Sequence, residues 1–196
     1  MNTKNRTQTI VGMGLLTAIV VVLQALSLSI RFGMFTITLV LVPIIVGAAL
    51  YGVWAGAWLG LIFGIVVLFT DAGLFLAVNI PGTIITVLAK GIGAGVVAAL
   101  VYKAIATHSK FGAALVAGIA APVTNTGIFL IGCVLFFMST IKEWAAAAGF
   151  ENVGVYLIAG MVGTNFVIEL IINLALSATI VQIINIARKS GAGNVQ

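Results

Sequence analysis

Three polar side chains recur at a helical spacing inside a long apolar run. Asn165, Glu169 and Asn173 lie four residues apart, so a helix would align them in one stripe. An ionisable group inside a membrane-spanning helix costs roughly 3 kcal/mol on insertion scales and is by default a candidate functional residue. The spacing predicts that Asn165 and Glu169 form one wall of an interior site, and that the deeper Asn173 packs against another helix.

The composition indicates an integral membrane protein. Of the 196 residues, 62% are hydrophobic and 7% are charged, against about 25% charged in soluble domains. The mean hydropathy is +1.30, and the apolar runs are continuous, which favours helices over a β-barrel. We predict an all-α, single-domain bundle of about six spans. We expect no cleavable signal peptide, because the first apolar run is full-length and lacks a small-residue cleavage site.

The distribution of basic residues predicts the orientation. Basic side chains gather near both termini and in the loop with Lys103 and Lys110, whereas Arg31 and Lys142 lie in loops on the other side. An even number of spans with this bias places both termini in the cytoplasm, and it explains the net charge of +5 without a nucleic-acid partner. The expected spans are residues 9–29, 36–50, 53–69, 81–102, 113–138 and 155–186.

Further polar residues fall at the same depth as the first stripe. With a rise of ~1.5 Å per residue, Lys90, Asn125, Asn165 and Glu169 occupy overlapping levels between the outer half and the midplane of the membrane. Amides that both donate and accept hydrogen bonds, together with a cation inside apolar walls, are typical of a small-molecule pocket. The alternative is structural, with a Lys90–Glu169 salt bridge and the Asn side chains joining helices.

Two outer loops contribute further candidates. Asn79 and Arg31 are placed to close the site from above, whereas Asp71, in an outer connection, is expected to be solvated. We expect no catalytic residue, no metal and no bound cofactor, because no nucleophile or metal-ligand set accompanies Lys90 and Glu169. An intramembrane enzyme is therefore disfavoured. A stand-alone ion-coupled carrier that uses Glu169 is a further alternative, although the two halves show no evident inverted repeat.

Small residues mark two helix faces for close contact. Gly14 and Ala18 form a small-xxx-small pair in the first span, for which internal packing and contact with a partner are equally plausible. Gly56, Gly60 and Gly64 recur every four residues in the third span. This second face is expected to pack against another helix of the same chain.

Four stretches together resemble a known family. They are residues 41–60 (LVPIIVGAALYGVWAGAWLG), 79–83 (NIPGT), 122–127 (PVTNTG) and 165–170 (NFVIEL). They look like the substrate-binding S components of energy-coupling factor (ECF) transporters, and the likeness covers nearly the whole chain.

The resemblance implies a six-helix protein of a prokaryotic plasma membrane that binds one vitamin from outside. It implies partners too, a transmembrane coupling protein and two ATPases, so that ATP is used outside this chain. The face with Gly14 and Ala18 resembles the docking face. In riboflavin-type members, polar residues of the fifth and sixth spans contact the ligand, and Asn125 and Asn165 fall at matching places. Those members carry a basic residue near the position of Glu169.

Among these components the chain is most similar to the pantothenate-specific members. Pantothenate is a flexible anion with hydroxyl and amide groups, and a cation, Lys90 or Arg31, with several Asn partners suits it. Glu169 does not suit a carboxylate directly, and is expected to accept from a hydroxyl or to orient Lys90. Riboflavin, hydroxymethylpyrimidine or pyridoxine, and folate are the alternatives.

Overall fold

The fold is that of an all-helical bundle, as predicted. The computed structural model describes residues 3–27, 31–32, 35–36 and 39–189, without the side chains of residues 3–6, 31–32, 35–36 and 188. Its longest elements are α1 (Thr3–Ser27), α3 (Val53–Thr70), α5 (Ile80–Ile105) and α6 (Lys110–Phe136). The remaining elements are β1 (Arg31–Phe32), β2 (Phe35–Thr36), α2 (Leu41–Tyr51), α4 (Gly73–Leu76), α7 (Met138–Ala147), α8 (Val153–Val155), the π-helix η1 (Tyr156–Gly163), α9 (Thr164–Ala175) and α10 (Ser177–Lys189).

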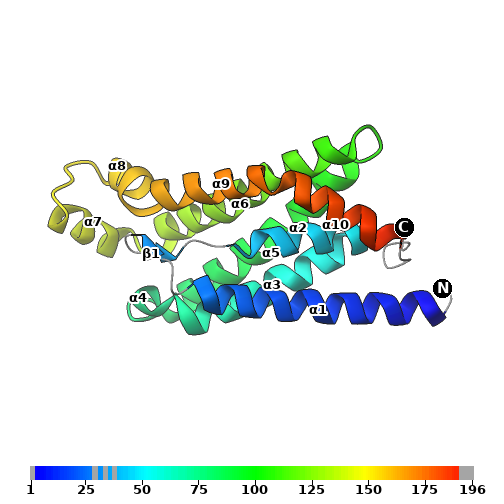
Figure 1. Ribbon diagram of the computed structural model, residues 1–196. Coiled ribbons are helices and arrows are strands. Elements are labelled where there is room, and N and C mark those ends of the chain that lie inside the picture. Colours follow the sequence, from blue (N-terminus) through cyan, green and yellow to red (C-terminus); the bar gives the residue numbers. More distant parts are fainter. Residues whose placement is uncertain (1–2, 28–30, 33–34, 37–38, 190–196) are drawn as a thin grey trace.

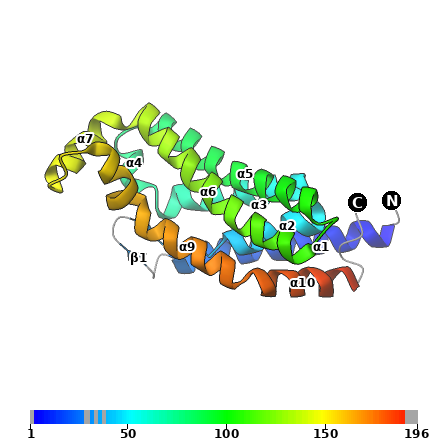
Figure 2. The same cartoon turned by 90° about the horizontal axis from the view of Figure 1, so that it is seen from above.

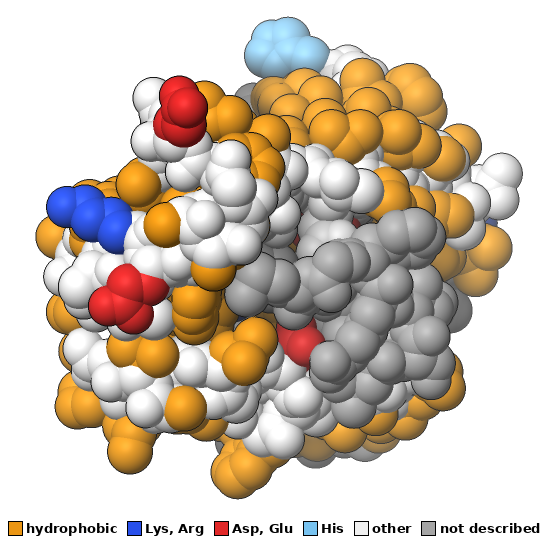
Figure 3. Space-filling model, turned by 90° about the vertical axis from the view of Figure 1, so that its left-hand side faces the viewer, with side chains coloured by type: hydrophobic (Ala, Val, Ile, Leu, Met, Phe, Trp, Pro, Cys, Tyr) orange, Lys and Arg blue, Asp and Glu red, His pale blue; other side chains and the backbone are white. Residues whose placement is uncertain are grey.

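The long helices run along a common axis (Figure 1). α1 begins and α10 ends at the same end of the bundle, which we call the terminal end, and the α5–α6 connection lies there too. α4, α7 and α8 lie at the opposite end, which we call the α7 end (Figures 1 and 2). Figure 3 looks onto the α7 end, where charged side chains are few and an acidic one is visible in a hollow beside the grey residues.

Five helical segments within the described residues are long and apolar enough to cross a membrane. They identify a multi-pass membrane protein. These segments are Thr7–Ser27, Val53–Thr70, Ile80–Ile105, Lys110–Phe136 and Val153–Ala175.

The prediction of a second span over residues 36–50 is wrong at its start. Thr36 pairs with Arg31 in a short antiparallel β-ribbon, and α2 begins only at Leu41. Pro43 suits this start, because proline has no N–H to donate and is best accommodated in the first turn of a helix, where that N–H has no partner within the helix. With 11 residues, α2 is too short to span a bilayer, and nine of them are buried.

The predicted sixth span over residues 155–186 is also wrong as one continuous helix. It consists of η1, α9 and α10, with a break at Leu176. The Ser177 hydroxyl donates to the carbonyl oxygen of Asn173 over 3.0 Å, and such bonding of a hydroxyl to the preceding turn bends helices. α10 therefore forms a separate helix at the terminal end.

Glycines bring α3 and α5 into backbone contact. A Cβ atom on Gly56 would collide with the carbonyl of Gly95, and one on Gly60 with the carbonyl of Gly91. The glycine face predicted in the third span is thus confirmed as an internal packing surface. Both views place α3 beside α5 and α9 beside α6, so α5 and α6 form the centre of the bundle (Figures 1 and 2).

Candidate functional site

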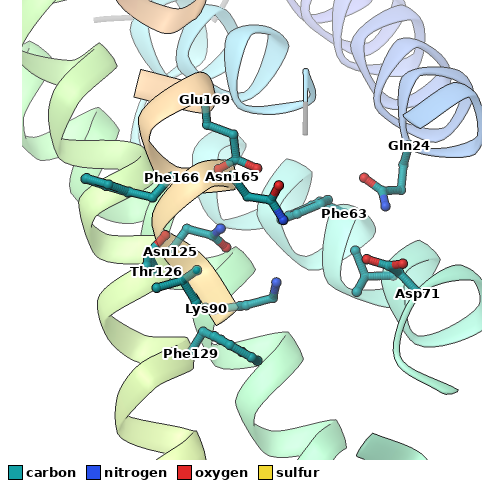
Figure 4. A pocket seen from close by; sticks show the side chains of 12 residues that line it. Gln24, Phe63, Asp71, Lys90, Asn125, Thr126, Phe129, Asn165, Phe166 and Glu169 are labelled. Atoms are coloured by element: carbon teal, nitrogen blue, oxygen red, sulfur yellow. The ribbon is translucent and has the colours of Figure 1, made fainter. Parts of the chain in front are cut away.

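A polar pocket lies where two apolar clusters meet. Phe63 and Val67 belong to the larger cluster around α2, α3 and α5, and Val162 belongs to a second cluster toward the α7 end. The pocket encloses about 60 Å³. The lining residues are Gln24, Phe63, Val67, Asp71, Lys90, Asn125, Thr126, Phe129, Val162, Asn165, Phe166 and Glu169 (Figure 4).

The polar stripe of the last span is present as predicted. Asn165, Glu169 and Asn173 are the buried residues of α9, whereas Val167 and Ile171 on the other face are 51% and 59% exposed. A helix that turns its amides and carboxylate inward and its aliphatic side chains outward suits a lipid surround rather than water. α9 therefore forms one wall of the pocket.

Lys90 extends from α5 into the pocket, where its ammonium lies between two aromatic rings (Figure 4). Its Nζ is 5.6 Å from the ring centroid of Phe63 and 5.5 Å from that of Phe129. Both distances are within the range of cation–π attraction. The charges of Glu169 and Asp71 also act on the ammonium. The rings and carboxylates thus favour the ammonium form of Lys90, whereas its burial opposes that charge.

Several buried amide atoms near this ammonium make no hydrogen bond to the described residues. Gln24, Asn125 and Asn165 are 1%, 6% and 8% exposed. Both amide atoms of Gln24 and of Asn165, and the Oδ1 atom of Asn125, make no hydrogen bond within the described part of the chain. A buried polar group without a partner costs about 1–3 kcal/mol, so these atoms are suited to a guest or to water that donates and accepts hydrogen bonds.

Two predicted site residues are not placed in this pocket. The side chain of Asn79 caps α5, where its Oδ1 accepts from the Gly82 N–H over 2.9 Å, and Asn79 is absent from the lining. The polar residue before Pro81 therefore serves as the N-cap of α5. Arg31 lies in β1, and its side chain is outside the described residues.

The pocket also contains residues that the sequence argument missed. Asp71 follows directly on the end of α3 at Thr70 and lines the pocket while only half-buried, so its expected contact with solvent is not contradicted. Gln24 is a further addition. It is a long polar residue in a largely apolar span, and this contrast could have identified it as a candidate site residue from the sequence.

Asn173 takes the packing role expected for it. Its Nδ2 atom donates to the backbone oxygen of Glu169 over 2.8 Å, and it does not line the pocket. Gly14 and Ala18 lie on the exposed side of α1, and a Cβ atom on Gly14 would meet nothing within 4 Å. This face is therefore not used for packing among the described residues.

A bundle of apolar helices around a polar pocket is typical of a multi-pass membrane protein that holds a small polar solute. The model of the ECF transporter substrate-specific component family matches residues 8–181. The chain belongs to this family of transporter S components.

A curated relative is the pantothenic acid transporter PanT of Lactococcus lactis subsp. cremoris (strain MG1363). The two sequences are 29% identical, in an alignment that covers 78% of this chain and 80% of the relative. The comparison with solved structures gives no match.

Proposed function

We propose that this protein binds a water-soluble vitamin from outside the cell, with pantothenate as the first candidate. The observation that carries the proposal is the set of buried amide atoms near the Lys90 ammonium that have no partner among the described residues. The pocket offers a cation for a carboxylate, and amides for hydroxyl and amide groups. The relative whose name specifies pantothenic acid transport supports this candidate.

The remaining steps of transport belong to partner proteins. The chain delivers the vitamin inward with a transmembrane coupling protein and two ATPase subunits, in the plasma membrane of a prokaryote. It catalyses no reaction itself, and ATP is hydrolysed by the partners. The exposed face of α1 at Gly14 and Ala18 is the contact for the coupling protein, since small residues allow another helix to approach closely.

A binding screen tests the proposed substrate. The purified protein, stripped of bound ligand by partial unfolding and refolding in detergent, is titrated by calorimetry with pantothenate, riboflavin, pyridoxine, hydroxymethylpyrimidine and folate. Pantothenate is expected to bind most tightly. In the Lys90→Met variant, the loss of a charge-assisted contact worth about 1.5–3 kcal/mol should weaken pantothenate binding tenfold or more.

Tighter binding of another vitamin would transfer the assignment to that vitamin. Absence of binding to every member of the panel by folded, monodisperse protein would contradict the proposed function itself.

A further inference from the structure

Gln24 occupies an unusual place in α1. The inner face of the outer half of α1 consists of Val20, Gln24 and Ser27, which are each at most 1% exposed. The Ser27 hydroxyl donates to the backbone oxygen of Leu23, and Val20 packs in the larger apolar cluster. Gln24 lies between them, lines the pocket, and has no hydrogen-bond partner for either amide atom within the described residues.

The other polar residues of the pocket come from helices other than α1. Lys90 comes from α5, Asn125 from α6 and Asn165 from α9, and Gln24 is the contribution of α1 to the described lining. Figure 4 shows the Gln24 amide directed from α1 toward the space next to Phe63 and Asp71, across from Asn165. A guest that satisfies both Gln24 and Asn165 must therefore bridge α1 and α9.

The chemistry of Gln24 restricts which part of a guest it contacts. The Nε2 atom is a donor and the Oε1 atom is an acceptor, so a hydroxyl or an amide satisfies both, whereas a carboxylate satisfies the donor alone. The carboxylate of an anionic vitamin is attracted to Lys90 instead.

We infer that Gln24 is a substrate contact that binds the uncharged hydroxyl or amide part of the vitamin and thereby ties α1 to the rest of the site. The inference rests on the proposed function. Among the described residues, α1 otherwise packs against α2 and α3. The Trp58 Nε1 atom of α3 donates a hydrogen bond to the Thr17 hydroxyl of α1 over 3.2 Å. Because the Gly14 and Ala18 face belongs to the same helix, α1 carries both a substrate contact and the proposed partner contact.

The test uses two variants of α1, one expected to lower the affinity for pantothenate and the other to lower the melting temperature. Gln24→Leu removes the amide at similar volume, so the ligand-free protein should unfold at the same or a higher temperature, because an unsatisfied buried group is gone. Its affinity for pantothenate should fall about tenfold to a hundredfold. Val20→Ala leaves a cavity in the core one turn away, so it should lower the melting temperature and keep the affinity.

A second ligand locates the contact on the vitamin. Panthenol, the neutral alcohol analogue of pantothenate, keeps the hydroxyls and the amide. Gln24→Leu should weaken panthenol and pantothenate binding by the same factor. A loss confined to pantothenate would overturn the assignment to the uncharged part.

The remaining outcomes are also decisive. Unchanged affinity in Gln24→Leu would show that water satisfies the amide, and a joint fall of melting temperature and affinity would show a structural role. Either result overturns the inference while the unmodified protein still binds pantothenate. If the unmodified protein binds no vitamin, the inference and the proposed function fail together.

Discussion

Asn165 and Asn173 lie on the same buried face of α9 but have different surroundings. Asn165 lines the pocket with both amide atoms unpartnered within the described residues, whereas Asn173 donates to the backbone oxygen of Glu169. We expect Asn165→Ala to weaken vitamin binding by about 1–3 kcal/mol, because its hydrogen bonds to the ligand are lost. Calorimetric titration measures this effect.

Asn173→Ala is the matched control on the same helix. It removes an interaction within α9, so the melting temperature should fall while the affinity is kept. Equal affinity losses in the two variants would mean that the stripe acts through helix packing rather than through ligand contact.

Much of the pocket follows from the sequence at the scale of residues. Lys90, Asn125, Asn165 and Glu169 were selected because polar groups are costly in a membrane and because their depths coincide, and the structure brings all four together. Asp71 and Asn79 both lie next to helix ends, where hydropathy does not indicate the direction of a side chain. Asp71 lines the pocket whereas the Asn79 side chain caps α5, and this difference depends on where each helix ends in the bundle.

At the scale of helices, the exposed face of α1 gives a prediction about assembly. Gly14→Leu should leave vitamin binding intact, since a Cβ atom there meets no neighbour within 4 Å and the residue is exposed. It should block association with the coupling module by filling the close-approach surface. Co-purification of the tagged variant with the coupling protein and the ATPases measures the association.

Gly127→Leu is the control for this prediction. Gly127 lies within α6, and a Cβ atom there also meets nothing within 4 Å. This variant should bind both vitamin and module. Normal association of the Gly14→Leu variant with the coupling module would contradict the assignment of the partner contact to this face of α1.

The sequence predicts the presence of a helix better than it predicts where that helix starts or breaks. Long apolar runs indicate spans because a bilayer accepts little else, and α3, α5 and α6 lie close to their expected ranges. The late start of α2 and the break at Leu176 depend on Pro43 and on the hydroxyl of Ser177. Each acts through a backbone hydrogen bond that hydropathy does not register.

At the scale of the whole molecule, the core toward the terminal end is closed. The larger cluster there contains buried aliphatic side chains of α2, α5, α6 and α10, such as Ile44, Ala98, Ala117 and Ile184. The described residues of this cluster are mainly aliphatic, which opposes the passage of a polar vitamin through it. We expect the protein alone in liposomes to bind radiolabelled pantothenate without accumulating it, and uptake to require the coupling protein, the ATPases and ATP.

Vitamin or ion flux through the isolated chain would contradict this expectation. It would favour the stand-alone ion-coupled carrier in which Glu169 exchanges a proton or cation. An empty-liposome control and the Glu169→Gln variant would separate such flux from leakage.

The small volume of the pocket has a consequence for the speed of capture. The described residues leave a volume of about 60 Å³, well below the ~300 Å³ at the low end of small-molecule pockets, so a vitamin would be held entirely within the pocket only after the walls move apart. The apparent affinity is reduced by the fraction of molecules in that widened state. If widening precedes binding, the observed association rate levels off at the rate of opening as the vitamin concentration rises. High affinity would then come from slow release of the ligand.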